Sequence, residues 1–123
     1  MEQKALIGLA ASLAHPFRPS AECTSGTVAA AIMTAESHFF TGVCVDTECS
    51  LGFCAEHAAI AEMLKARESA VRMIVAVNEE GAVLPPCGRC RELLWQVDKR
   101  NQNAWIVLGP EDGAWLRDLL PRR

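Results

Sequence analysis

The 123-residue sequence contains no run of basic residues, no internal repeat, no linker and no long uninterrupted apolar stretch. Lys and Arg total 12 against 15 Asp and Glu, a formal charge of −3, so the basic surface of a phosphate-backbone binder is missing. No stretch approaches the roughly 18 to 20 apolar residues that span a bilayer. Half the residues are hydrophobic and 22% are charged, which excludes wholesale disorder. We therefore expect one globular domain over residues 1–123.

The N-terminal segment contains an apolar run at 5–11 that could indicate a signal peptide. Glu2 stands beside Lys4 in the leading segment, so the start is not clearly positive. The helical spacing of the apolar residues favours an amphipathic helix instead, with a face made of Leu6, Leu9, Ala10 and Leu13. Without an export signal we expect a soluble, cytoplasmic protein whose thiols stay reduced.

Short strand-like and helix-like segments alternate along the rest of the chain. Pro16 and Pro19 predict a loop over 15–25. The pattern then predicts strands at 27–34 and 39–45 around a hairpin turn at 35–38, a helix at 54–68, a strand at 72–77 and a turn at 78–81. A rigid connector is expected at 83–86. A helix is expected from Pro86, with Leu93, Leu94 and Val97 directed inward. It is followed by a strand at 104–108, a turn at 109–113 and a short helix at 115–120 that ends before Pro121. This alternation implies a central sheet covered by helices.

Six cysteines could indicate disulfides, a metal site or redox chemistry. Cys54 opens one predicted helix, and Cys87 and Cys90 lie in the first turn of the next. The positive end of a helix favours thiolate over thiol, and residues three apart on a helix point to one side. Three protein ligands leave the fourth tetrahedral position of zinc for water, as in catalytic zinc sites.

Glu56 follows Cys54 by two residues, where it can contact such a water without ligating zinc. Other interpretations stay open at this point. The cysteines could be small buried hydrophobes, Cys87 and Cys90 could be a redox dithiol, and His57 could be a fourth ligand of a closed structural site. Cys23, Cys44 and Cys49 show no partner pattern and are expected to be buried or incidental thiols.

Two segments carry a family resemblance when they are taken together, namely Cys54-Ala55-Glu56 and Pro86-Cys87-Gly88-Arg89-Cys90-Arg91-Glu92-Leu93. They resemble the zinc-dependent cytidine deaminases, in the small branch with only cysteine ligands that also includes blasticidin S deaminase. The resemblance implies an α/β fold, a three-layer α/β/α sandwich with a mixed central sheet. It also implies a Zn²⁺ cofactor, a small nucleoside-type substrate rather than a nucleic acid polymer, and a homotetramer.

The resemblance makes the three cysteines zinc ligands and Glu56 the proton shuttle of a hydrolytic deamination. Zinc-activated water would add at C4 of a cytosine ring while Glu56 protonates N3 and then the departing amine. Three thiolates around Zn²⁺ leave a net charge of −1, which nearby donors must compensate. In this branch an arginine commonly follows the catalytic Glu and contacts the sulfurs, but His57 stands here. His57, Arg91, which matches the family, and Arg89 are the candidates for this compensation.

The substrate contacts depart from the family pattern. Cytidine deaminases usually hold the ribose with an Asn-x-Glu segment, whereas the matching residues here are Cys44-Val45-Asp46. With Ala55, Cys44 and Asp46 are the expected substrate-binding residues. We expect conversion of cytidine or deoxycytidine to the uracil nucleoside plus ammonia, in pyrimidine salvage or detoxification. The alternatives are a blasticidin S-type antibiotic deaminase, a catalytically silent zinc-binding regulatory module and, disfavoured by the acidic charge, a polynucleotide-editing enzyme.

Overall fold

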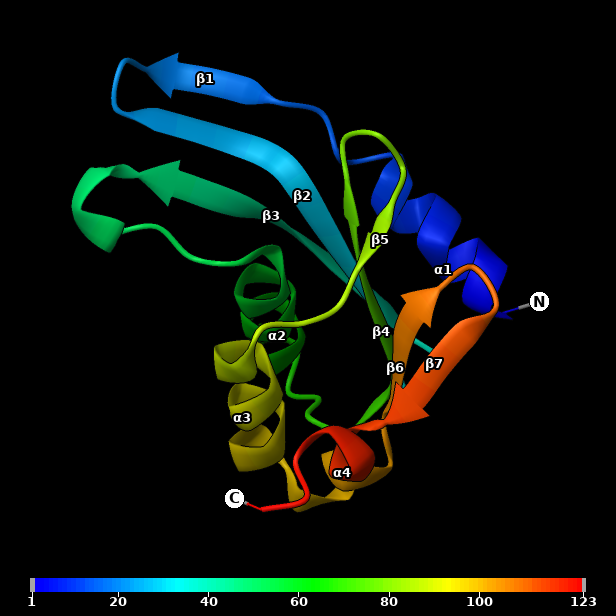
Figure 1. The fold of residues 1–123 in the computed structure, drawn as a ribbon. Coiled ribbons are helices and arrows are strands. Elements are labelled where there is room, and N and C mark those ends of the chain that lie inside the picture. The colour runs from blue at the N-terminus through cyan, green and yellow to red at the C-terminus, as the bar shows by residue number, and fades with distance from the viewer. Residues whose placement is uncertain (1, 123) are drawn as a thin grey trace.

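The computed structural model describes residues 2–122, which form a seven-stranded mixed sheet flanked by helices (Figure 1). The helices are α1 (Glu2–Ala11), α2 (Ala55–Lys65), α3 (Gly88–Val97) and α4 (Leu116–Leu119), with short 3₁₀ helices η1 (Glu48–Ser50) and η2 (Lys99–Asn103). The strands are β1 (Phe17–Ser20), β2 (Cys23–Thr34), β3 (Phe39–Thr47), β4 (Val71–Asn78), β5 (Val83–Leu84), β6 (Trp105–Gly109) and β7 (Asp112–Trp115).

The sheet runs in the order β1-β2-β4-β6-β7, with β3 paired to β2 and β5 paired to β4. Strands β4 and β6 are parallel, and the other pairs are antiparallel. A parallel pair needs a crossover connection, which here is the segment containing α3. The predicted mixed sheet is thus confirmed.

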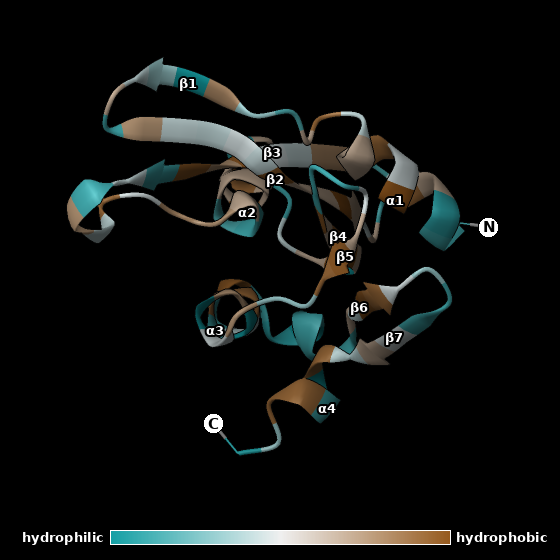
Figure 2. Cartoon of the chain, turned by 45° about the horizontal axis from the view of Figure 1, so that its top comes forward, coloured by the Kyte–Doolittle hydropathy of each residue, from teal (hydrophilic) through white to brown (hydrophobic). Residues whose placement is uncertain are grey.

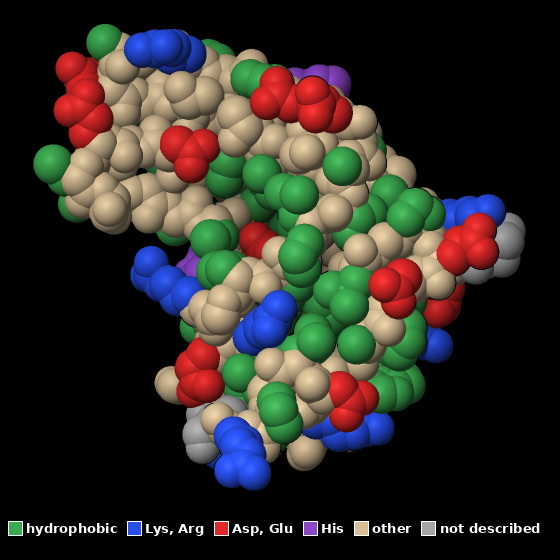
Figure 3. Space-filling model, viewed as in Figure 1, with side chains coloured by type: hydrophobic (Ala, Val, Ile, Leu, Met, Phe, Trp, Pro, Cys, Tyr) green, Lys and Arg blue, Asp and Glu red, His purple; other side chains and the backbone are tan. Residues whose placement is uncertain are grey.

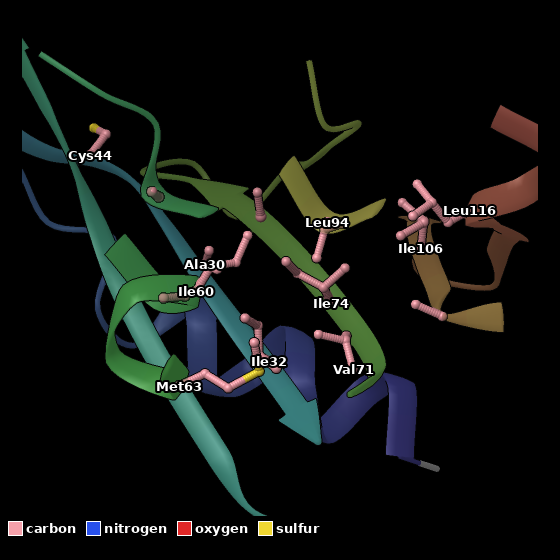
Figure 4. Packing of buried hydrophobic residues seen from close by; sticks show 14 residues of the cluster. Ala30, Ile32, Cys44, Ile60, Met63, Val71, Ile74, Leu94, Ile106 and Leu116 are labelled. Carbon is pink, nitrogen blue, oxygen red and sulfur yellow. The ribbon is translucent and has the colours of Figure 1, made fainter. Parts of the chain in front are cut away.

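Alternate residues of β2, β4 and β6 enter two separate cores, because successive side chains of a strand point to opposite faces of the sheet. On one face they pack against α2 and α3, and Figure 4 shows this cluster. Its strand residues are Ala30, Ile32, Ile74, Ala76 and Ile106. The intervening residues pack against α1 on the opposite face, and they are Ala31, Met33, Val75, Val77 and Val107. The predicted three-layer arrangement is therefore confirmed.

The predicted loop at 15–25 was wrong. Phe17–Ser20 forms β1, and β2 begins at Cys23 rather than at residue 27. Strand β1 is exposed along its whole length and, among residues 2–122, pairs only with β2, at Phe17↔Ser25 and Ser20↔Cys23. An edge strand tolerates Pro19 because one side of its backbone forms no ladder, so proline did not exclude a strand here.

Two further short strands were also missed. The predicted connector at 83–86 contains β5, and the predicted turn at 109–113 contains the start of β7, which delays the closing helix to Leu116. A strand of only two to four residues is too short to show a recognisable alternation of apolar and polar side chains. Strand β5 is an apolar segment in Figure 2, whereas α4 also contains the charged Arg117 and Asp118. Leu116, the first residue of α4, is fully buried.

The N-terminal and central helices are shorter than expected. Helix α1 buries Leu6 and Ala10, but Leu13 lies beyond its end at Ala11 and is exposed, so Leu13 was wrongly included in the apolar face. The helix predicted over 54–68 ends at Lys65. No helix of residues 2–122 has the length and apolar character required to cross a membrane.

Candidate active site

Helices α2 and α3 present their N-termini to the same side of the fold, and a cysteine stands at each of these ends. Cys54 is the N-cap of α2 and Cys87 is the N-cap of α3, both with extended backbone angles. Neither thiol caps its own helix, so both sulfurs are free for other partners. Cys90 lies within the first turn of α3 and is fully buried.

The three sulfurs form one cluster. The Cys54 and Cys87 Sγ atoms lie 3.8 Å apart, the Cys87 and Cys90 Sγ atoms lie 3.3 Å apart, and all three lie within 4.8 Å of one another. With a Zn–S bond of about 2.3 Å, tetrahedral geometry separates two thiolate sulfurs by about 3.8 Å. The cluster therefore fits Zn²⁺.

Burial shapes the acidity of these groups. It is the main cause that raises the pKa of the Cys54 and Cys90 thiols, and the nearby Glu56 adds to both shifts. Burial also acts to raise the pKa of Cys87, but hydrogen bonds from the Cys90 amide and from the Cys90 and Cys54 thiols hold it below its usual value. A divalent cation between the sulfurs would offset the cost of burying thiolates.

Glu56 occupies the second position of α2 and is only 6% exposed. Burial raises the pKa of its carboxyl above the usual range. Gly42 contributes to this placement, because a Cβ there would overlap the backbone of Ala59, so β3 packs directly against α2. A buried carboxyl with a raised pKa is suited to proton transfer within an active site.

A cavity of about 460 Å³ is lined both by cysteines of the cluster and by residues of β2 and β3. Glu56, Cys54 and Cys87 are among its lining residues. The predicted substrate residues Cys44, Asp46 and Ala55 line the same cavity. Further lining residues that the sequence did not suggest include Thr27, Val28, Thr47, Phe53 and Leu84.

The part of the cavity wall that β2 and β3 form has its own hydrogen-bond network. The Thr27 hydroxyl donates to Asp46 Oδ2 at 3.1 Å and lies 3.1 Å from Cys44 Sγ. The Val28 amide donates to the same sulfur at 3.4 Å. The Thr47 hydroxyl is buried and has no hydrogen-bond partner within the described part of the chain. The interactions of Thr27 depend on the pairing of β2 with β3, which leaves no motif in the sequence.

The candidates for charge compensation have different surroundings. His57 Nδ1 lies 3.6 Å from Cys90 Sγ. Burial, and next the charge of Arg89, lower the pKa of His57. Arg89 is exposed and lines the cavity. Arg91 instead donates from Nε to the Pro86 carbonyl oxygen at 3.1 Å.

The other three cysteines do not join the cluster. Cys44 is buried, Cys23 is half-buried and Cys49 is exposed. Within residues 2–122 all six cysteines are free, so the even number does not reflect disulfides.

Comparison with known proteins agrees with this site. A model of the cytidine and deoxycytidylate deaminase zinc-binding region matches residues 2–104. The chain belongs to this family. It is accordingly a zinc-dependent deaminase, a hydrolase that acts on cytidine-type substrates.

Solved structures of cytidine deaminases have the same fold as this chain. The Mycobacterium tuberculosis cytidine deaminase is 28% identical, with a TM-score of 0.81 over 98% of this chain and 95% of that chain. The Burkholderia pseudomallei cytidine deaminase is 27% identical, with a TM-score of 0.74 over 95% and 94%. The Mycobacterium leprae cytidine deaminase, at 24% identity, shows the fold alone, with a TM-score of 0.82 over 99% of both chains.

Proposed function

We propose that this deaminase converts an unphosphorylated cytosine nucleoside or nucleoside analogue, with cytidine and deoxycytidine as the first candidates, to the uracil form and ammonia. The observation that carries the proposal is the shared cavity, in which the cysteine cluster and the buried Glu56 face a space of about 460 Å³. A cavity of this size can hold a small ligand.

In this proposal Cys54, Cys87 and Cys90 hold the zinc ion. The bound zinc supplies Lewis acidity that makes water nucleophilic at neutral pH. Glu56 takes a proton from the attacking water and delivers it to N3 of the ring as the new C4–O bond forms. Glu56 then carries the proton of the new C4 hydroxyl to the exocyclic nitrogen, the C4–N bond breaks, the C4 carbonyl forms and ammonia leaves. Because Glu56 is almost completely buried, it exchanges protons with the substrate rather than with bulk water.

The charges around the cavity favour a substrate without phosphate. Asp46 and Glu56 are the acidic lining residues and Arg89 is the basic one. A dication held by three thiolates adds a net charge of −1, so the loaded site is negative overall. The face in Figure 3 carries acidic and basic side chains interspersed rather than a continuous basic surface. Both features argue against a nucleotide or polynucleotide substrate.

Asp46 is the group that we assign to the part of the substrate beyond the ring. Thr27 orients its carboxylate through Oδ2. A carboxylate accepts hydrogen bonds from hydroxyl or ammonium groups and repels phosphate. Cys44, whose sulfur already accepts from the Val28 amide, offers little to a hydroxyl. The acceptor that Asp46 offers favours blasticidin S, an analogue whose larger substituent is rich in hydrogen-bond donors, as the second candidate substrate.

A panel of substrates tests the proposal. Cytidine, deoxycytidine, cytosine, blasticidin S and deoxycytidylate are each incubated with the zinc-loaded protein, and loss of cytosine-ring absorbance and release of ammonia are measured. We expect turnover of a nucleoside or of blasticidin S, and at least ten-fold lower kcat/KM for deoxycytidylate. Asp46→Asn should raise KM more than it lowers kcat and should reduce the discrimination against deoxycytidylate. Turnover of none of the five would contradict the proposal and favour a silent zinc module.

We further propose a homotetramer in the cytoplasm. Large apolar side chains are exposed near the cavity, with Leu51 80% and Phe53 42% exposed, and Phe17 on β1 is 66% exposed. Large apolar side chains that are exposed on a single chain are candidates for a subunit interface. The free cysteines are consistent with a reducing compartment. Light scattering coupled to size-exclusion chromatography measures the assembly, and a mass of one chain would contradict the tetramer.

A further inference from the structure

The Cys90 sulfur is the most enclosed of the three in the cluster. Cys90 has 0% exposed surface, whereas Cys54 is half-buried and Cys87 is exposed. Water therefore cannot stabilise negative charge on this sulfur, and a buried anion needs a hydrogen-bond donor from the protein. Cys90 is where the fold must supply such a donor when a metal is bound.

His57 is the side chain that meets this need. Its amide donates to the Cys54 carbonyl oxygen at 3.0 Å, which fixes the first turn of α2, and its Nδ1 then lies 3.6 Å from Cys90 Sγ. Arg91 is directed to the Pro86 carbonyl oxygen instead. Among the residues described, His57 is thus the candidate for charge compensation whose side-chain nitrogen lies beside the sulfur of a cluster cysteine.

We propose that His57 is a positioning residue that donates an Nδ1–H hydrogen bond to the Cys90 thiolate and so retains the zinc ion. Imidazole carries its hydrogen on either nitrogen, and an anionic sulfur beside Nδ1 selects the form that donates from it. The bond withdraws charge from the sulfur and fixes its direction. Hydrogen bonds of this kind to metal ligands typically change metal affinity by about 10- to 100-fold.

The cluster geometry argues against His57 as a fourth ligand. Cys54, Cys87 and Cys90 form a set whose potential ligand atoms all lie within 4.8 Å of one another, and among the described residues His57 is not part of this set. His57 does not line the cavity that Glu56 faces. The ring therefore contacts the cluster from outside, through one sulfur.

Two substitutions of similar shape separate hydrogen bonding from packing. His57→Asn keeps an N–H close to the position of Nδ1, whereas His57→Leu fills similar space without a donor. Each protein is loaded with zinc, its fold is checked by circular dichroism, and zinc release to a coloured chelator is timed without substrate. We expect release about 10- to 100-fold faster for His57→Leu and within about three-fold of the parent for His57→Asn. The control His15→Ala changes an exposed histidine outside the cluster, and it should release zinc at the parental rate.

Cobalt substitution gives a second readout. In His57→Leu the thiolate-to-cobalt charge-transfer band should shift, while its intensity and the tetrahedral d–d bands keep the pattern of three thiolates. Equal release rates for the Asn and Leu variants would overturn the proposal, and so would d–d bands that show the loss of a nitrogen ligand. If His57→Leu fails to fold, the Asn variant decides alone, since a fast release there contradicts the proposal. Because no substrate is used, these results are independent of the proposed deamination.

Discussion

The Cys54 and Cys87 sulfurs lie 3.8 Å apart although 33 positions separate them in the chain. Each cysteine stands at the N-terminus of its own helix, so the cluster links α2 to α3 at one end. A metal bound there would hold the two helices together, in addition to any catalytic role. Metal content and thermal stability should consequently change together.

Cys87→Ser should lower the zinc content from about one ion per chain to well below one, because a hydroxyl is a much weaker zinc ligand than a thiolate. Its melting temperature should fall to that of the parent protein treated with a chelator. Elemental analysis and a thermal melt measure both quantities. Cys49→Ser, at an exposed cysteine outside the cluster, is the control and should change neither. Full zinc retention by Cys87→Ser would show that the cluster is not the zinc site.

Glu56→Gln should keep zinc and fold but lose about 10²- to 10⁴-fold in kcat, the usual contribution of a positioned acid or base. The amide is nearly isosteric with the carboxyl but cannot carry a proton between water and the ring. Steady-state kinetics with the best substrate of the panel, together with zinc content, make the comparison. Glu79→Gln, in the exposed turn after β4, is the matched control. Parental activity in Glu56→Gln would remove Glu56 from its proposed role.

The features of this site that depend on neighbouring residues in the sequence could be predicted, whereas the contacts between residues far apart in the sequence could not. A cysteine before a helical pattern is visible in the sequence, so the two helix starts and the position of Glu56 beside Cys54 were recognised. The hydrogen bond from Thr27 to Asp46 joins residues 19 positions apart through the register of β2 and β3. The direction of the Arg91 side chain depends on the Pro86 carbonyl oxygen, which accepts its hydrogen bond. Neither relationship has a periodic signal.

The same distinction applies to the fold. Strands β2 and β4 and helices α2 and α3 were predicted because their side chains alternate between buried faces or recur at helical spacing. Strands β1, β5 and β7 are held by pairing with a neighbour rather than by their own pattern. Asn101 is the clearest omission, since it is a fully buried polar residue in a segment that reads as an ordinary polar turn.

Asn101→Ala should destabilise the protein by about 3 kcal/mol, because it leaves several buried backbone groups without partners. The Asn101 side chain accepts from the Val71 amide at 2.7 Å and donates to the carbonyl oxygens of Ser69 and Leu94 at 3.0 and 2.9 Å. These bonds tie η2 to the start of β4 and to α3. Urea unfolding measures the change. Lys99→Ala, at an exposed position of η2, should cost no more than about 0.5 kcal/mol, and an equal loss in both variants would contradict the assignment.

Asp98 should make stability depend on pH in the acid range. Its carboxylate accepts from the Arg100 side chain, the Arg100 amide and the Ser69 hydroxyl, and the Arg100 guanidinium is the main cause that holds the pKa of Asp98 well below its usual value. A carboxyl whose pKa is lower in the folded chain stabilises it above the unfolded pKa of about 3.9, and this contribution is lost as the pH falls toward the folded value. Asp98→Asn keeps an acceptor for the η2 cap but removes the charge. Urea unfolding from pH 7 to pH 2.5 should show the variant less stable than the parent at neutral pH and the difference shrinking below about pH 4. A difference that stays constant over this range would mean that the Asp98 charge contributes nothing.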